Sequence, residues 1–227
     1  MREIIFDTET TGLDPAKGDR MVEIGCIEMV NRVATGRTFH AYFNPDIPMP
    51  AEAEAVHGLS DSFLADKPRF HEKAGELLEF LGEAPLVAHN AGFDFTFLNA
   101  ELRICGLEPV CGSRMVDTIA IAKVRHPGAK LSLDALCTRY GIDRSHRTRH
   151  GALLDAELLA QLYVELNGGR QIGLELAAVQ ETTIVAAAAA VHRERVFRPA
   201  RPHAADAEEL ARHAAFVESL KSPLWTG

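Results

Sequence analysis

Short apolar runs near the start of the chain predict three β-strands. Residues 4–6 read Ile-Ile-Phe, residues 21–30 alternate between apolar and polar side chains, and residues 36–43 form a third run that ends at Asn-Pro. A period of two is typical of strands that bury one face. Because the connections between these runs are short, we expect an antiparallel meander.

From residue 70 onward, apolar side chains recur at helical spacing, and short apolar runs lie between the helical stretches. We expect strands at residues 85–88 and 115–116, and helices at residues 70–81, from Phe93 to near Gly106, from Asp117, and at residues 133–140 and 152–166. Ser60 and Ser132 are expected to cap helices. Strands in hairpin order, followed by strands that alternate with helices, predict an α/β fold with a mixed five-stranded sheet flanked by helices.

The pattern changes beyond Gly169. An apolar but weakly patterned stretch leads into a basic, proline-bearing stretch, and residues 206–220 predict a last amphipathic helix. Such composition favours a linker and a terminal segment outside the domain. We therefore divide the chain into a domain over residues 1–169, a linker over residues 170–203 and a docking segment over residues 204–227.

Composition adds limits on function. The 227 residues are 47% hydrophobic and 25% charged, as in an ordinary soluble globular protein. A formal net charge of −8 argues against coating duplex nucleic acid through the overall field. A site that grips a few phosphates through bound metal ions stays possible, because a divalent ion reverses the potential of the acidic cluster that holds it.

Cysteine spacing and hydropathy bear on the redox state of the thiols and on where the protein is located. The four cysteines show no Cys-x-x-Cys pair and predict buried, reduced thiols. The N-terminus lacks a signal-peptide pattern, and the alanine run at residues 186–190 is too short to span a bilayer. We expect a cytoplasmic protein with no membrane partner.

The first strand leads into an acidic pair. Side chains alternate along a strand, so Asp7 and Glu9 point to the same side. Two neighbouring carboxylates do not both stay ionised without a counter-charge, so either one holds a proton or a cation lies between them. A divalent metal ion fits the second case, although an aspartate at a strand end also fits a simple turn cap.

Two more carboxylates and a histidine precede or begin helices. Asp94 lies at a strand-to-helix junction, and Asp155 lies one turn into the last helix of the domain, with no obvious basic partner. His150 lies on the loop just before that helix. Taken singly, each carboxylate also fits the helix start, where the macrodipole favours negative charge, and His150 also fits an ordinary surface loop.

The ordered motifs Asp-x-Glu at residues 7–9, His-Asn-x-x-Phe-Asp at 89–94 and His-x-x-x-x-Asp at 150–155 resemble those of the DEDDh exonucleases. Residues 56–58 and 132–137 are also similar to the family. The resemblance covers residues 1–169, is closest to the bacterial proofreading members, and implies a ribonuclease H-like fold.

The resemblance implies metal-dependent 3′-to-5′ hydrolysis that releases nucleoside 5′-monophosphates. Two divalent cations, Mg²⁺ or Mn²⁺, would be held by four carboxylates, those of Asp7, Glu9, Asp94 and Asp155. His150 would act as general base on the attacking water.

The resemblance also implies contacts with a single-stranded or frayed 3′ end of DNA. Beside the metal-binding carboxylates, the substrate would meet Thr10, Glu52, His57 and Phe93. Stacking on an aromatic ring needs no sequence preference, which suits any mispaired end. Glu52 lies close to Glu54, and a solvated helix face is the competing interpretation.

The tail carries two peptide patterns. Gln171, Leu174 and Leu176 resemble the peptide that bacterial partners insert into the sliding clamp (beta), a short pattern that also occurs by chance. Leu220, Leu224 and Trp225 resemble a segment that docks on the alpha subunit of DNA polymerase III. Packing of this helix on its own domain is the alternative, and a small accessory subunit is left open as a further partner.

Three functions are compatible with these features. The first is a proofreading 3′-to-5′ exodeoxyribonuclease of a replicative polymerase. The second is a stand-alone exonuclease that trims RNA or short oligonucleotides, which a chain ending near Gly169 would have favoured. The third is a non-catalytic adaptor between clamp and polymerase, against which the complete acidic set and His150 argue.

Overall fold

The computed structural model describes residues 1–145, 147, 150–169 and 204–221. The chain divides into two compact units, residues 1–176 and residues 177–227. None of the helices in the described part is both long and apolar enough to cross a membrane.

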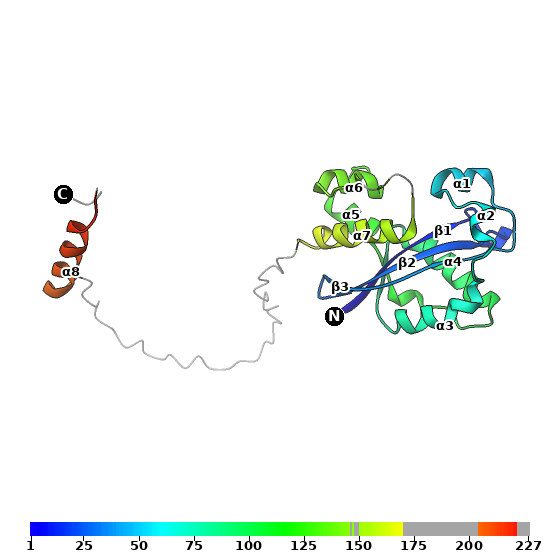
Figure 1. Cartoon of the computed structure of the whole chain (residues 1–227), viewed down its shortest axis with the longest axis horizontal. Helices are drawn as coiled ribbons and strands as arrows, with labels where there is room; N and C mark the ends of the chain where they lie inside the picture. The colour runs from blue at the N-terminus through cyan, green and yellow to red at the C-terminus, as the bar shows by residue number, and fades with distance from the viewer. Residues whose placement is uncertain (146, 148–149, 170–203, 222–227) are drawn as a thin grey trace, which may run out of the picture. The chain divides into compact units, whose positions relative to one another are not determined.

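A five-stranded sheet in the order β3-β2-β1-β4-β5 forms the centre of the first unit (Figure 1). The strands are β1 Arg2–Thr10, β2 Met21–Val30, β3 Val33–Tyr42, β4 Leu86–Ala88 and β5 Met115–Asp117. β1, β2 and β3 pair antiparallel, whereas β4 pairs parallel with β1 and β5 parallel with β4. The expected meander and mixed sheet are confirmed, and β1 is the central strand.

The helices begin and end close to the expected positions. They are α1 Ala51–His57, α2 Asp61–Leu64, α3 Phe70–Leu81, α4 Ala91–Ile104, α5 Thr118–Arg125, α6 Leu133–Tyr140, α7 Ala152–Leu166 and α8 Ala207–Glu218, with short 3-10 turns at Pro15–Lys17 and Gly112–Arg114. Ser60 and Ser132 accept backbone N–H groups at the starts of α2 and α6, as expected. Asp206 caps α8 in the same way, within the second unit.

Alternate residues of β1 belong to two hydrophobic cores. Ile4 and Phe6 pack with α3 and α4, and Ile5 packs with α5, α6 and α7. Figure 1 shows α3 and α4 on one side of the sheet and α5, α6 and α7 on the other. Because side chains alternate, Asp7 and Glu9 continue the Ile5 side and point toward the α7 layer.

Gly25 of β2 explains why α7 lies so close to the sheet. Gly25 pairs with Asp7 in the antiparallel register. A Cβ atom at Gly25 would overlap the backbone of Ala152 and Leu153, the first residues of α7. Only glycine permits this approach, which brings the first turn of α7 over the acidic end of β1.

Two expectations need correction. β1 is longer than the expected run at residues 4–6, because its pairing with β2 continues through Thr10 and includes the acidic pair. The cysteines are all free, but only Cys26 and Cys137 are buried. Cys111 is exposed because it lies in the loop before the second 3-10 turn, where its Sγ contacts the Ser113 hydroxyl at 3.1 Å.

Candidate active site

The strand half of the site consists of Asp7 and Glu9 on β1 and Asp94 on α4. Glu9 is 9% exposed and Asp94 is 3% exposed. The Thr8 hydroxyl donates to Asp94 Oδ1 at 2.8 Å, so β1 itself fixes the orientation of the third carboxylate. β4 ends at Ala88, and a left-handed residue, Asn90, turns the chain into α4. This junction places Asp94 at the same edge of the sheet as Asp7.

The α7 half consists of Asp155, His150 and Arg147. Asp155 is 3% exposed and lies in the first turn of α7. Arg147 Nε donates to Asp155 Oδ1 at 2.5 Å, and Arg147 Nη2 donates to Oδ2 at 2.7 Å. The expectation that Asp155 has no basic partner is therefore wrong. The loop folds back on α7, so a residue eight positions earlier reaches its first turn.

His150 lies near a carboxylate of each half of the site, Glu9 and Asp155. Its Nδ1 is 3.2 Å from Asp155 Oδ2 and 2.7 Å from Arg147 Nη2. A guanidinium has only donors and an ionised carboxylate only acceptors, so these two contacts of Nδ1 fit opposite ring tautomers, and the shorter contact favours the ring proton on Nε2. The backbone N–H of His150 donates to the Val56 carbonyl at 3.4 Å, which attaches this loop to α1.

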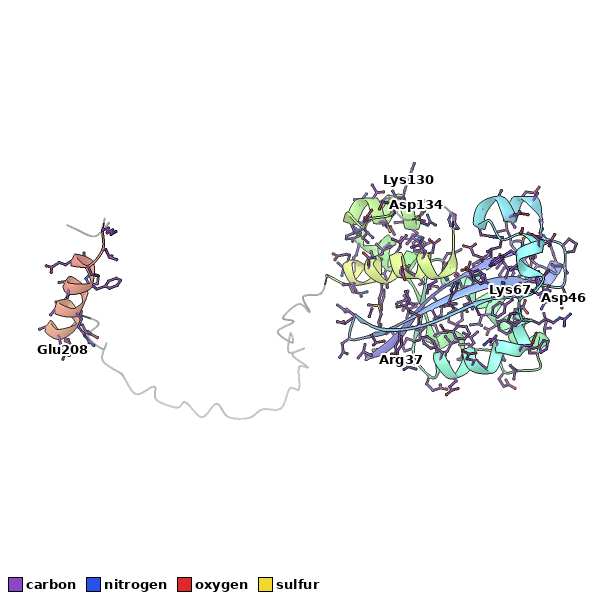
Figure 2. All side chains as sticks on the ribbon, viewed as in Figure 1. Arg37, Asp46, Lys67, Lys130, Asp134 and Glu208 are labelled. Atoms are coloured by element: carbon purple, nitrogen blue, oxygen red, sulfur yellow. The ribbon has the colours of Figure 1, made fainter. Side chains whose placement is uncertain are left out.

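A pocket of about 320 Å³ joins the two halves. Its lining includes the residues predicted to carry the chemistry, namely Asp7, Glu9, Asp94, His150 and Asp155, together with Phe93 and Arg147. Asp134 of α6 also lines the pocket and accepts from Arg147 Nη1 at 2.7 Å (Asp134 is labelled in Figure 2). Separate parts of the sequence, residues 7–9, 93–94 and 147, 150 and 155, thus face one pocket.

The environment of the strand half opposes ionisation of its three carboxyl groups. Burial, and then the charge of Asp94 and of Glu9, hold the pKa of Asp7 well above its usual range. Burial and the neighbouring Glu23 raise the pKa of Glu9 to about 8, and burial raises the pKa of Asp94 to about 7. Within the described part of the chain, no Lys, Arg or His lies within ion-pair distance of these three carboxylates.

This donor set fits a divalent cation. Ligand atoms of Glu9, His150 and Asp155 lie within 4.8 Å of one another and could hold a metal ion. Carboxylate oxygens are the ligands that hard cations prefer. A cation would also offset the cost of burying these carboxylates in their charged form, and the repulsion between Asp7 and its acidic neighbours.

The expected substrate residues differ in their surroundings. Phe93 lines the pocket and packs its ring 5.0 Å from that of Phe97. Thr10 is buried and donates its hydroxyl to the Gly12 carbonyl. His57 is buried too, and its Nε2 has no hydrogen-bond partner among the described residues. Glu52 is exposed on α1. Of these four, Phe93 alone belongs to the described lining of the pocket.

A mixed sheet with an acidic pocket at the end of its central strand defines a class of nucleases, and the sequence matches it. The exonuclease family (RNase_T) matches residues 4–163, and the chain belongs to this family. Its relatives include the DNA polymerase III subunits epsilon of Rickettsia felis and Escherichia coli K12. The Rickettsia felis protein is 46% identical over 228 residues, which cover 97% of both chains. The Escherichia coli protein is 41% identical over 238 residues, which cover 99% of this chain and 97% of the relative.

Solved structures confirm the fold. Exonuclease X in complex with 5′ overhanging duplex DNA matches with a TM-score of 0.57 and 25% identity over 72% of this chain and 90% of that one. The nuclease domain of 3′hExo, a DEDDh family member bound to rAMP, matches with a TM-score of 0.63 over 73% and 90%, and at 17% identity it shows the fold alone. The resemblance to DEDDh exonucleases and the ribonuclease H-like fold are confirmed.

Proposed function

We propose that this chain is the proofreading 3′-to-5′ exonuclease of a replicative DNA polymerase. It hydrolyses the 3′-terminal phosphodiester and releases nucleoside 5′-monophosphates. The observation that carries this proposal is the meeting of four acidic residues and one histidine at a single pocket, Asp7, Glu9, Asp94, Asp155 and His150. The name shared by its relatives, subunit epsilon of DNA polymerase III, supports the replicative context.

The four carboxylates hold the divalent cations, two Mg²⁺ or Mn²⁺ ions in this proposal. When bound, such ions stabilise negative charge on the attacking and leaving oxygens of a phosphoryl transfer. The protein contributes the fixed positions of the oxygen ligands. β1 orients Asp7 and Glu9, the Thr8 hydroxyl orients Asp94, and the Gly25 contact sets the distance from Asp155 to the strand.

His150 is the general base for the attacking water. Its side chain is 47% exposed, so it faces both the pocket and solvent and can return the proton after each cycle. An imidazole is suited to this role because it gains and loses protons near neutral pH.

The 3′-terminal nucleotide enters beside Phe93, whose ring offers a stacking face at the pocket. Thr10, Glu52 and His57 complete the nucleotide contacts in this proposal. His57 supports this proposal, because its buried Nε2 has no hydrogen-bond partner among the described residues and could bind the substrate. Glu52 is exposed on α1, so it contacts the substrate only if the substrate approaches that helix. A frayed mismatch reaches the pocket at the lowest cost, so the duplex supplies much of the selectivity.

The proposed partners are the polymerase alpha subunit and the sliding clamp, with a small accessory subunit left open. The clamp peptide Gln171, Leu174 and Leu176 and the docking residues Leu224 and Trp225 lie outside the described residues. Leu220 is described and is 36% exposed, just beyond the end of α8. An exposed leucine beside an amphipathic helix is compatible with docking to a partner.

A labelled primer tests the activity. A 5′-labelled DNA with a 3′ mismatch should shorten stepwise with Mg²⁺ or Mn²⁺ and stay intact with EDTA, and the paired primer should shorten more slowly. Internal cleavage, or digestion that ignores EDTA, would contradict the proposal. Faster digestion of an RNA primer of the same sequence would favour an RNA-trimming enzyme instead.

A truncation tests the docking segment. Removal of residues 170–227 should leave hydrolysis of free single strands within about twofold, because the pocket lies wholly in the first unit. The same truncation should abolish co-purification with the polymerase alpha subunit. Undiminished polymerase binding by the truncated chain would remove the docking segment from this account.

A further inference from the structure

Arg147 lines the pocket, and the proposed chemistry does not use it. Its side chain is 9% exposed, and the side chain of Asp155 is 4% exposed. The two residues form a forked ion pair in which each carboxylate oxygen accepts one guanidinium N–H, at 2.5 and 2.7 Å. Paired donors of this kind are the strongest protein ligands of a carboxylate.

The same guanidinium also contacts the proposed base. Arg147 Nη2 lies 2.7 Å from His150 Nδ1 and 2.7 Å from Asp155 Oδ2. While Arg147 Nη2 donates to Nδ1, that ring nitrogen is not free to accept a proton from another group. One cation of the chain therefore holds both the carboxylate and the histidine of the α7 half.

A metal ion and this guanidinium compete for the same oxygens. A divalent cation binds carboxylate oxygens at about 2.0–2.6 Å. A guanidinium donating to both oxygens of Asp155 would lie against that ion, and the two positive charges would repel each other. A guanidinium that pairs with both oxygens of Asp155 and a metal ion bound to those oxygens therefore exclude each other.

We propose that Arg147 is the counter-ion of the metal-free enzyme. It holds Asp155 in place of a divalent cation and leaves both oxygens when the cation binds, which also frees His150. This inference rests on the proposed metal ligands. Arg147 is thus a positioning residue: it keeps the metal-free α7 half neutral and lowers the affinity of the site for metal.

Asp134 on α6 can remain paired with the guanidinium of Arg147 after it leaves Asp155. Its Oδ1 accepts from Arg147 Nη1 and from Arg144 Nη1, each at 2.7 Å, and its side chain is 50% exposed. Arg144 is a matched control, because it shares this carboxylate and donates to Thr138 but forms no described contact with Asp155.

The test is a Mn²⁺ titration of the full chain, followed by the electron paramagnetic resonance signal of free Mn²⁺. Removal of the competitor in Arg147→Gln should tighten Mn²⁺ binding by about tenfold, the scale of one charge-assisted contact. Arg144→Gln should bind Mn²⁺ as the wild type does. In EDTA, Arg147→Gln should melt below the wild type, and saturating Mn²⁺ should close that gap.

The opposite pattern overturns the inference. If Arg147→Gln binds Mn²⁺ equally or more weakly, and melts lower by the same amount with and without Mn²⁺, Arg147 only anchors the loop. Asp7→Asn separates this failure from that of the metal assignment. Loss of Mn²⁺ binding in Asp7→Asn would support the proposed metal ligands. Mn²⁺ binding equal to that of the wild type would contradict them.

A measurement on the unmodified protein covers the case in which Arg147→Gln does not fold. The Nε–H signal of Arg147 in a ¹⁵N nuclear magnetic resonance spectrum should shift, and exchange faster with water, as Mg²⁺ saturates the site. A signal unchanged at saturation would contradict the exchange of guanidinium for metal.

Discussion

The two halves of the active site both contain buried carboxylates, but among the described residues only the α7 half supplies a basic side chain to pair with its carboxylate. The strand half places Asp7, Glu9 and Asp94 together with no ion-pair partner in the described chain, and burial, followed by the charge of neighbouring carboxylates, raises their pKa values. The α7 half gives Asp155 a forked partner, Arg147. The site carboxylates without a counter-charge in the described chain therefore lie on the strand half, whereas the charge of Asp155 on α7 is already balanced by Arg147.

The difference follows from where the carboxylates lie. β1 is paired on both edges and packed on both faces, so no long basic side chain has a path to its acidic end except from the pocket. Asp155 lies at the start of a helix, and the loop before it can supply a guanidinium. If cations bind the strand half as proposed, they would displace Arg147 from Asp155, and the site would differ between its free and metal-bound forms.

The largest expected effect comes from removing one strand carboxylate. Asp7→Asn should lower hydrolysis by at least about 10³-fold, roughly 4 kcal/mol of transition-state stabilisation. The same change removes a buried carboxyl group whose ionisation is opposed by burial and by its acidic neighbours, so the melting temperature in EDTA should rise. Single-turnover digestion and thermal melting measure the two effects. Asp66→Asn, an exposed surface carboxylate, is the control, and an active Asp7→Asn protein would refute the metal assignment.

The next effect comes from the base on the α7 half. His150→Gln should lower the single-turnover rate by roughly 10²- to 10⁴-fold, the usual contribution of general base catalysis. Because the side chain is half exposed, the fold should be unaffected. His71→Gln, on the exposed surface of α3, controls for loss of a histidine elsewhere. An undiminished rate would show that another group takes the proton.

Moving the halves apart should be costly as well. Gly25→Ala would push the added Cβ into the backbone of Leu153 and shift α7, lowering the free energy of unfolding by roughly 1–3 kcal/mol. Activity should fall with it, because Asp155 moves relative to Asp7. Gly75→Ala is the matched control: its Cβ meets open space on α3, so stability should rise slightly. Equal behaviour of both variants in urea unfolding would contradict the close packing of α7.

A pH series tests the electrostatic difference itself. The folded, metal-free protein keeps protons on Glu9 and Asp94, with pKa values of about 8 and about 7, that the unfolded chain has released. The free energy of unfolding therefore falls as the pH rises from about 5 to about 8. In EDTA the melting temperature should drop by roughly 5 °C or more across this range. Saturating Mg²⁺ should remove most of the drop, and a flat profile in EDTA would contradict the raised pKa values of the strand half.

Much of this site follows from sequence alone, and the rest depends on packing. Alternation along β1 is enough to place Asp7 and Glu9 on one face, and helix spacing places Asp155 in the first turn of α7. Arg147 is not predictable in this way, because a loop has no period and its partners come from α6 and α7 at once. The role of Gly25 is hidden for the same reason, since no pattern states which strand residue lies under a helix.

Anomalous diffraction from crystals grown with Mn²⁺ tests the central claim most directly, because it locates the ions without reference to activity. The account predicts Mn²⁺ within about 2.5 Å of carboxylate oxygens of both Asp7 and Asp155, with Arg147 moved away from Asp155. A pocket that binds no Mn²⁺ at millimolar concentration, or Mn²⁺ bound elsewhere with the Arg147–Asp155 pair intact, would contradict it.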